Sequence, residues 1–118
     1  MITSSERDIS VIKIILSFCN YVSERIEKHN MTYDEFILNL EYQDLLGMPI
    51  MQIGEYAKRL SKEFTDSHKN IPWSDIRDMR NIYAHEYLDL NLDFVWDTAN
   101  DDIPELRKFC EEVLKEIS

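Results

Sequence analysis

The amino-acid sequence predicts an all-α protein, an up-and-down bundle of about four to six helices that forms a single domain over residues 1–118. Three observations support this fold class. The chain holds only two glycines and three prolines, too few for the many tight turns of a β-rich fold. Apolar residues recur at helical spacing over long stretches. The polar connections between these stretches are short, which favours antiparallel neighbouring helices.

The first helix is predicted from about Ser5 to Lys28. Asp8 places negative charge near its start, where the helix dipole favours it, and Asn30 is a stop signal. The sequence Thr32-x-x-Glu35 is a capping box and opens a short second helix that continues to about Leu40. The apolar stripe of the first helix consists of Ile9, Ile12, Leu16, Cys19, Val22 and Ile26.

A third helix is predicted from about Tyr42 to Phe64, followed by a polar loop over residues 65–70. We expect a kink or a break at Pro49, because proline has no backbone N–H to donate. Gly54 costs about 1 kcal/mol relative to alanine in the middle of a helix. Its position therefore predicts the close approach of another helix backbone.

The segment Pro72-Trp73-Ser74 begins a fourth helix, which is predicted to fade near His85. Asn91 is a good N-cap for a fifth helix. A further cap at Asp102-Ile103-Pro104 is predicted to open the last amphipathic helix, which ends near Ile117. The sequence contains no repeat and no second domain.

The formal net charge of −10 opposes non-specific nucleic-acid binding, which usually needs clustered basic residues. Any contact with RNA must therefore use a local positive site or a partner protein. Cys19 and Cys110 each lie in an apolar helical pattern, which predicts two buried thiols in a reducing compartment. No metal site or other cofactor is predicted. Because no apolar run approaches about 18 residues, we expect a cytoplasmic protein with no membrane span.

His85 differs from the other two histidines of the chain. His29 ends the first helix, and His68 lies in the predicted polar loop, where we expect it to be solvated. His85 follows Arg80 by five residues, which would place the two about 140° apart on one unbroken α-helix. A shared site therefore needs a helix end at His85 or a second copy of the chain. A structural histidine at a helix end is the alternative.

The chemistry of this pair suits RNA cleavage. Arginine holds a phosphate through fork-shaped donors and is always charged. A histidine that titrates near neutrality can move a proton. The attack of a ribose 2′-hydroxyl on its own phosphodiester needs this binding of the phosphate and this proton transfer, and it needs no metal.

The segment Arg80-x4-His85-x-Tyr87 resembles the Arg-x4-6-His motif of the HEPN superfamily, extended by the tyrosine of its HepT-like branch. Asn81 matches the polar residue that usually follows the arginine. The likeness covers about two thirds of the chain, from Ile53 to the C-terminus. Four further blocks resemble that branch in the same order: Ile53-Gly54-Glu55-x-Ala57-Lys58-Arg59-Leu60, Ile71-Pro72-Trp73-x-Asp75-Ile76-x-x-Met79-Arg80-Asn81, Leu92-Asp93-x-Val95-Trp96 and Asp102-Ile103-Pro104-x-Leu106.

This resemblance implies a homodimeric helical bundle with two motif copies at a cleft between subunits. It implies a metal-independent endoribonuclease, the toxin of a toxin–antitoxin pair whose antitoxin is an MntA-type nucleotidyltransferase. Arg80 would stabilise the pentavalent phosphate, Asn81 would orient it, and His85 would act as general acid or base. Tyr87 would accept AMP from the antitoxin. The added bulk and negative charge beside Arg80 and His85 would block the RNA site.

Three further residues are candidates for the cleft. Arg77, one turn before Arg80, would add positive charge, and Glu55 is either a cleft residue or a surface or salt-bridged glutamate. Glu86 stands where the branch commonly has glycine or a small residue. Its carboxylate would favour protonated His85 and would also repel an RNA phosphate, which would lower the activity. Two alternatives are a non-catalytic nucleotide- or substrate-binding subunit of a nucleotidyltransferase complex and a plain helical interaction module.

Overall fold

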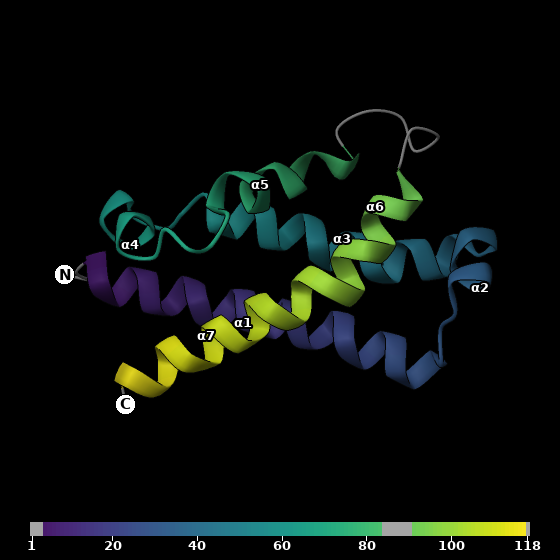
Figure 1. Ribbon diagram of the computed structural model, residues 1–118, viewed down its shortest axis with the longest axis horizontal. Helices are drawn as coiled ribbons and strands as arrows, with labels where there is room; N and C mark the ends of the chain where they lie inside the picture. The colour runs from purple at the N-terminus through teal and green to yellow at the C-terminus, as the bar shows by residue number, and fades with distance from the viewer. Residues whose placement is uncertain (1–3, 84–90, 118) are drawn as a thin grey trace.

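A computed structural model of the chain describes residues 4–83 and 91–117, and it confirms the all-α prediction (Figure 1). The three longest helices are α1 (Ser4–His29), α3 (Leu40–Ala57) and α7 (Ile103–Ile117). α1 packs against both α3 and α7. Within the described ranges no residue belongs to a strand. None of the helices found there is long and apolar enough to cross a membrane.

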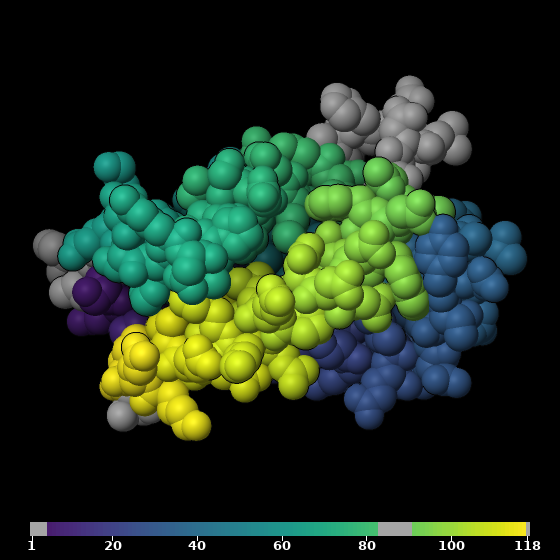
Figure 2. Space-filling view, in the orientation of Figure 1, coloured from purple at the N-terminus to yellow at the C-terminus, as the bar shows by residue number. Residues whose placement is uncertain are grey.

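The apolar stripe predicted for the first helix lies at the centre of the core. Figure 2 shows α7 lying across α1, so that only the two ends of α1 remain visible on this face. Ile12, Cys19 and Val22 of this stripe are fully buried, whereas Ile9, Leu16 and Ile26 are only partly buried. The fully buried side chains that meet in the core include Ile12, Ile15, Cys19 and Val22 of α1, Leu46, Ile50 and Ile53 of α3, and Ile103 and Cys110 of α7.

Both cysteines are free and buried, as the sequence predicts. Burial raises the pKa of the Cys110 thiol to about 12, and the nearby Glu111 carboxylate acts in the same direction. Burial also raises the pKa of the Cys19 thiol well above its ordinary value. Because the thiolate is the reactive form, these two side chains act as core residues and not as nucleophiles.

The predicted signals between the first helices are confirmed. Asn30 adopts a φ of 50°, in the left-handed region that commonly ends a helix. Thr32 caps α2 (Tyr33–Leu38), since its Oγ1 accepts from the Glu35 backbone N–H at 3.2 Å and donates to Glu35 Oε1 at 3.0 Å. Asn39 then caps the start of α3 with its side chain. Local side-chain caps therefore fix this turn of the chain.

The predicted end of the third helix is wrong. α3 ends at Ala57, and α4 (Lys62–Ser67) begins as a separate helix before Phe64 is reached. Ser61 caps α4 with its hydroxyl. The buried Asp8 of α1 fixes this turn, because its carboxylate accepts from the Ser61 N–H at 2.8 Å and from the Ser61 hydroxyl at 2.7 Å. A hydrogen bond between residues 53 positions apart in the chain thus accompanies the end of a helix that the sequence pattern would continue.

The break considered at Pro49 and the loop predicted over residues 65–70 also differ from the structure. α3 passes through Pro49 without a break. Pro49 is buried, and we infer that its packing offsets the missing backbone hydrogen bond. The loop predicted over residues 65–70 is helical as far as Ser67.

The fourth predicted helix begins where expected but does not stay α-helical. α5 (Trp73–Asp78) starts directly after Pro72 and gives way to the 3₁₀ segment η1 (Met79–Tyr83). The expectation of an α-helix that continues to His85 is therefore wrong over residues 79–83. A 3₁₀ segment has about 3.0 residues per turn, so the angle calculated for a regular α-helix does not apply here.

The last part of the chain holds one confirmed cap and one correction. Asn91 caps α6 (Leu92–Asp97), because its Oδ1 accepts from the Phe94 N–H at 3.0 Å. The second cap predicted at Asp102 is wrong. The π-helical segment η3 (Thr98–Asp102) joins α6 to α7 without a loop. Partial burial, followed by the neighbouring carboxylates, raises the pKa of Asp102.

Candidate functional site

Gly54 brings α3 against the backbone of η1, as its position in the sequence predicts. A Cβ atom placed on Gly54 would lie 2.9 Å from the carbonyl oxygen of Ile76 and 3.0 Å from the carbonyl carbon of Met79. It would lie closer still to the backbone nitrogen of Arg80. These are backbone atoms, which cannot swing aside as the end of a side chain can. Only glycine therefore permits this contact, and Arg80 is seated directly on α3.

The side chain of Arg80 also turns toward α3. Its Nη1 lies 3.7 Å from Oε2 of Glu55, the residue after Gly54. The two side chains are 43% and 45% exposed. The distance is longer than a hydrogen bond, and an exposed ion pair of this kind contributes about 0–1 kcal/mol. A guanidinium carries about five N–H donors, so Arg80 retains donors for a second anion.

The other described candidates lie on the same stretch of chain. Asn81 follows Arg80 in η1 and is exposed. Arg77 lies in α5 and is half-buried. Among residues 4–83 and 91–117, no carboxylate approaches Arg77 to within 4.0 Å, whereas Glu55 pairs with Arg80. The structure therefore brings Arg80 and Glu55 together, and Arg77 and Asn81 lie close to Arg80 in the chain.

The remaining candidates, His85, Glu86 and Tyr87, lie outside the described residues. Their roles stay predictions, as does the expected effect of Glu86. The direct pairing of Glu55 with Arg80 was not specified by the sequence, because the two are far apart in the chain. Gly54 was the one local signal that indicated a close approach at this place.

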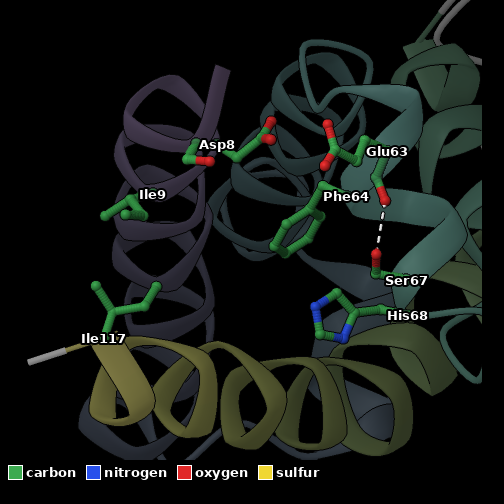
Figure 3. A pocket seen from close by; sticks show the side chains of 8 residues that line it. Asp8, Ile9, Glu63, Phe64, Ser67, His68 and Ile117 are labelled. Atoms are coloured by element: carbon green, nitrogen blue, oxygen red, sulfur yellow. Dashed lines mark hydrogen bonds between the residues drawn. The ribbon is translucent and has the colours of Figure 1, made fainter. Parts of the chain in front are cut away.

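A separate pocket lies between the start of α1, α4 and the end of α7, and Figure 3 shows the side chains that line it. It has a volume of about 290 Å³. His68 faces this pocket and is half-buried, so it is less exposed to solvent than the sequence predicts. Its ring packs against Phe64 and Phe109, with centroids 4.6 and 5.1 Å away. None of the described site residues, Glu55, Arg77, Arg80 and Asn81, lines this pocket, and we assign it no part in the chemistry of Arg80.

The all-helical fold and the motif Arg80-x4-His85-x-Tyr87 agree with the HEPN superfamily. Within it, the chain belongs to the HepT-like family, because the family model described as "Ribonuclease HepT-like" matches residues 11–113. The match includes most of α1, and so extends beyond the part of the chain that carries the motif blocks.

Individual relatives agree with this family. The chain is 33% identical over 101 residues to a candidate RNase of Caldanaerobacter subterraneus subsp. tengcongensis, covering 86% of this chain and 88% of that protein. It is 33% identical over 88 residues to a candidate RNase of Methanocaldococcus jannaschii, covering 75% and 73%. It is 28% identical over 83 residues to a probable ribonuclease HepT of Thermococcus cleftensis, covering 70% and 76%. No solved structure matches the chain.

Proposed function

We propose that this protein is a metal-independent endoribonuclease and the toxin of a toxin–antitoxin pair. Membership of the HepT-like family and the names of its relatives support ribonuclease chemistry. The observation that carries the proposal is Arg80, a half-exposed guanidinium on a backbone fixed against α3. Its remaining N–H donors can bind an RNA phosphate on a chain whose net charge of −10 opposes long-range attraction of RNA.

The proposed reaction uses the 2′-hydroxyl of the RNA as the nucleophile. This oxygen forms a bond to phosphorus while the bond from phosphorus to the 5′-oxygen breaks. His85 takes the proton from the 2′-hydroxyl or gives one to the leaving 5′-oxygen, and water exchanges the other proton. Arg80 stabilises the negative charge of the pentavalent phosphate, and Asn81 orients it. The products are a 2′,3′-cyclic phosphate end and a 5′-hydroxyl end.

The proposed partners follow from the same family resemblance. Two copies of the chain would form a homodimer and bring two Arg80–His85 motifs to one cleft. An MntA-type nucleotidyltransferase would transfer AMP to the Tyr87 hydroxyl and neutralise the toxin. The modification adds negative charge two residues from His85, which would compete with RNA for Arg80. We place this pair in the cytoplasm.

The reaction is tested by incubating the purified protein with RNA in the presence of a chelator. We expect fragments with 2′,3′-cyclic phosphate ends, and we expect none from Arg80→Ala. Binding without cleavage would contradict the nuclease and would favour a nucleotide- or substrate-binding subunit of a nucleotidyltransferase complex. If the protein neither binds nor cleaves RNA, the remaining alternative is a plain helical interaction module.

The proposed regulation has a separate test. Intact mass is measured on protein produced with and without its neighbouring nucleotidyltransferase. We expect mass gains in steps of one AMP that disappear in Tyr87→Phe. Unmodified protein in the presence of an active transferase would contradict the role of Tyr87.

A further inference from the structure

Arg80 and Glu55 form a site whose nearest charges cancel. Glu55 Oε2 lies 3.7 Å from Arg80 Nη1, and within the described parts of the chain it is the one carboxylate within 4.0 Å of this guanidinium. Both groups are nearly half exposed, so an incoming anion can reach Arg80 without breaking a buried contact. An anion on Arg80 therefore also meets the negative charge of Glu55.

Neither partner can move far from the other. Glu55 lies within α3, whose helix continues to Ala57. The backbone of Arg80 is held against Gly54, the residue before Glu55. The ion pair is thus attached to two backbones that touch each other. A ligand that binds Arg80 changes the side-chain geometry but leaves Glu55 beside the site.

Phosphate ligands differ in charge. An internal phosphodiester of RNA carries one negative charge, whereas a phosphomonoester carries about 1.5 to 2 at pH 7. A lone arginine attracts the second charge as well as the first. A carboxylate next to that arginine opposes the second charge by Coulomb repulsion. The pair consequently favours the singly charged ligand relative to an isolated arginine.

We propose that Glu55 makes the Arg80 site selective for phosphodiesters over phosphomonoesters. Glu55 is then a specificity-determining residue: it weakens the binding of terminal phosphates and free inorganic phosphate at Arg80 more than it weakens the binding of RNA linkages. The inference rests on the proposed function only in that Arg80 is the phosphate-binding residue. It does not require that the bound diester is cleaved.

Two small ligands test this selectivity at pH 7.5: thymidine 3′-monophosphate and its methyl ester, thymidine 3′-(methyl phosphate). They differ by one methyl group and one charge, and neither has a 2′-hydroxyl, so neither can undergo the cleavage reaction. Binding of each is measured by NMR titration to wild type and to Glu55→Gln. We expect Glu55→Gln to shift the ratio of the two dissociation constants toward the monoester by about threefold or more.

Control variants separate the local charge from the net charge. Glu41→Gln removes one carboxylate from the exposed first turn of α3, about 21 Å along the helix from Glu55, and should leave the ratio unchanged. Glu55→Asp keeps the charge and should keep most of the selectivity. Arg80→Ala should weaken the binding of both ligands.

A ratio of the two dissociation constants in Glu55→Gln that lies within twofold of the wild-type ratio would overturn the proposal. Ligand binding that Arg80→Ala leaves unchanged would also overturn it, and so would the absence of measurable binding to wild type. The result of this binding experiment can be distinguished from the result of the RNA-cleavage experiment. Selective binding without RNA cleavage would sink only the nuclease, and RNA cleavage with an unchanged ratio would sink only the role of Glu55. Circular dichroism of each variant checks that the helical fold is intact.

Discussion

Gly54 lies against the backbone nitrogen of Arg80, so close that no Cβ atom fits between α3 and η1. The neighbouring Glu55 pairs with the Arg80 side chain at 3.7 Å. Two consecutive residues of one helix therefore hold both the backbone and the head group of the proposed phosphate-binding arginine. The contact of Gly54 with the Arg80 backbone therefore sets where the Arg80 side chain can meet Glu55.

Gly54→Ala should displace η1. The added methyl group meets backbone atoms of Ile76, Met79 and Arg80, and such overpacking costs about 1–3 kcal/mol. We expect a lower free energy of unfolding in urea and up to about a 100-fold loss of RNA cleavage, because small shifts of a catalytic group are costly. Gln52→Ala, a half-buried position on the same helix, is the control. A Gly54→Ala protein as stable and active as wild type would contradict the seating of Arg80.

Asp8→Ala should loosen the start of α4. The variant removes the acceptor of the part-buried Ser61 N–H and hydroxyl, and a donor left without a partner costs at most about 1–3 kcal/mol. Urea unfolding measures the loss. Asp66→Ala breaks only the exposed pair with Lys62 at 3.5 Å and should change stability by less than about 1 kcal/mol. Equal effects of the two substitutions would mean that the buried contact is not special.

These two sites show what could and could not be predicted from the sequence. Caps read locally, such as Thr32 and Asn91, are confirmed because their donors lie three residues away. Gly54 predicted a close backbone approach because no local reason explained it. The break before α4 had one local signal, the Ser61 cap, but the contact with Asp8 of another helix that fixes it could not be predicted.

The candidate site shows the same division. The motif Arg80-x4-His85-x-Tyr87 can be recognised in the sequence. The partner of Arg80 is fixed by the packing of α3 against η1, which no local pattern specifies. The change from α-helix to 3₁₀ helix at Met79 also has no strong local signal, such as a proline or glycine. Packing contacts therefore decided the features that the sequence pattern missed.

Stability should fall in alkaline solution. Burial raises the pKa of Cys110 from 9.0 to about 12 in the folded chain. The Cys110 thiol contributes fully to the stability of the fold below pH 9, where it is protonated in both the folded and the unfolded chain. This contribution declines as the pH rises toward about 12, because the unfolded chain loses its thiol proton first. Each proton contributes about 1.4 kcal/mol per pH unit in this window. Urea unfolding between pH 9 and pH 10.5 should show a shallower decline for Cys110→Ala. If the free energy of unfolding fell equally steeply with pH in wild type and in Cys110→Ala, the raised pKa of Cys110 would be contradicted.

We propose RNA cleavage by His85 together with Arg80. It is tested most directly by the cleavage rate of His85→Ala, measured on purified protein with a labelled RNA and a chelator. The control is His68→Ala, which alters the histidine of the separate pocket. We predict a loss of about 100-fold or more for His85→Ala and little change for His68→Ala. Equal cleavage rates for wild type and His85→Ala would contradict the account.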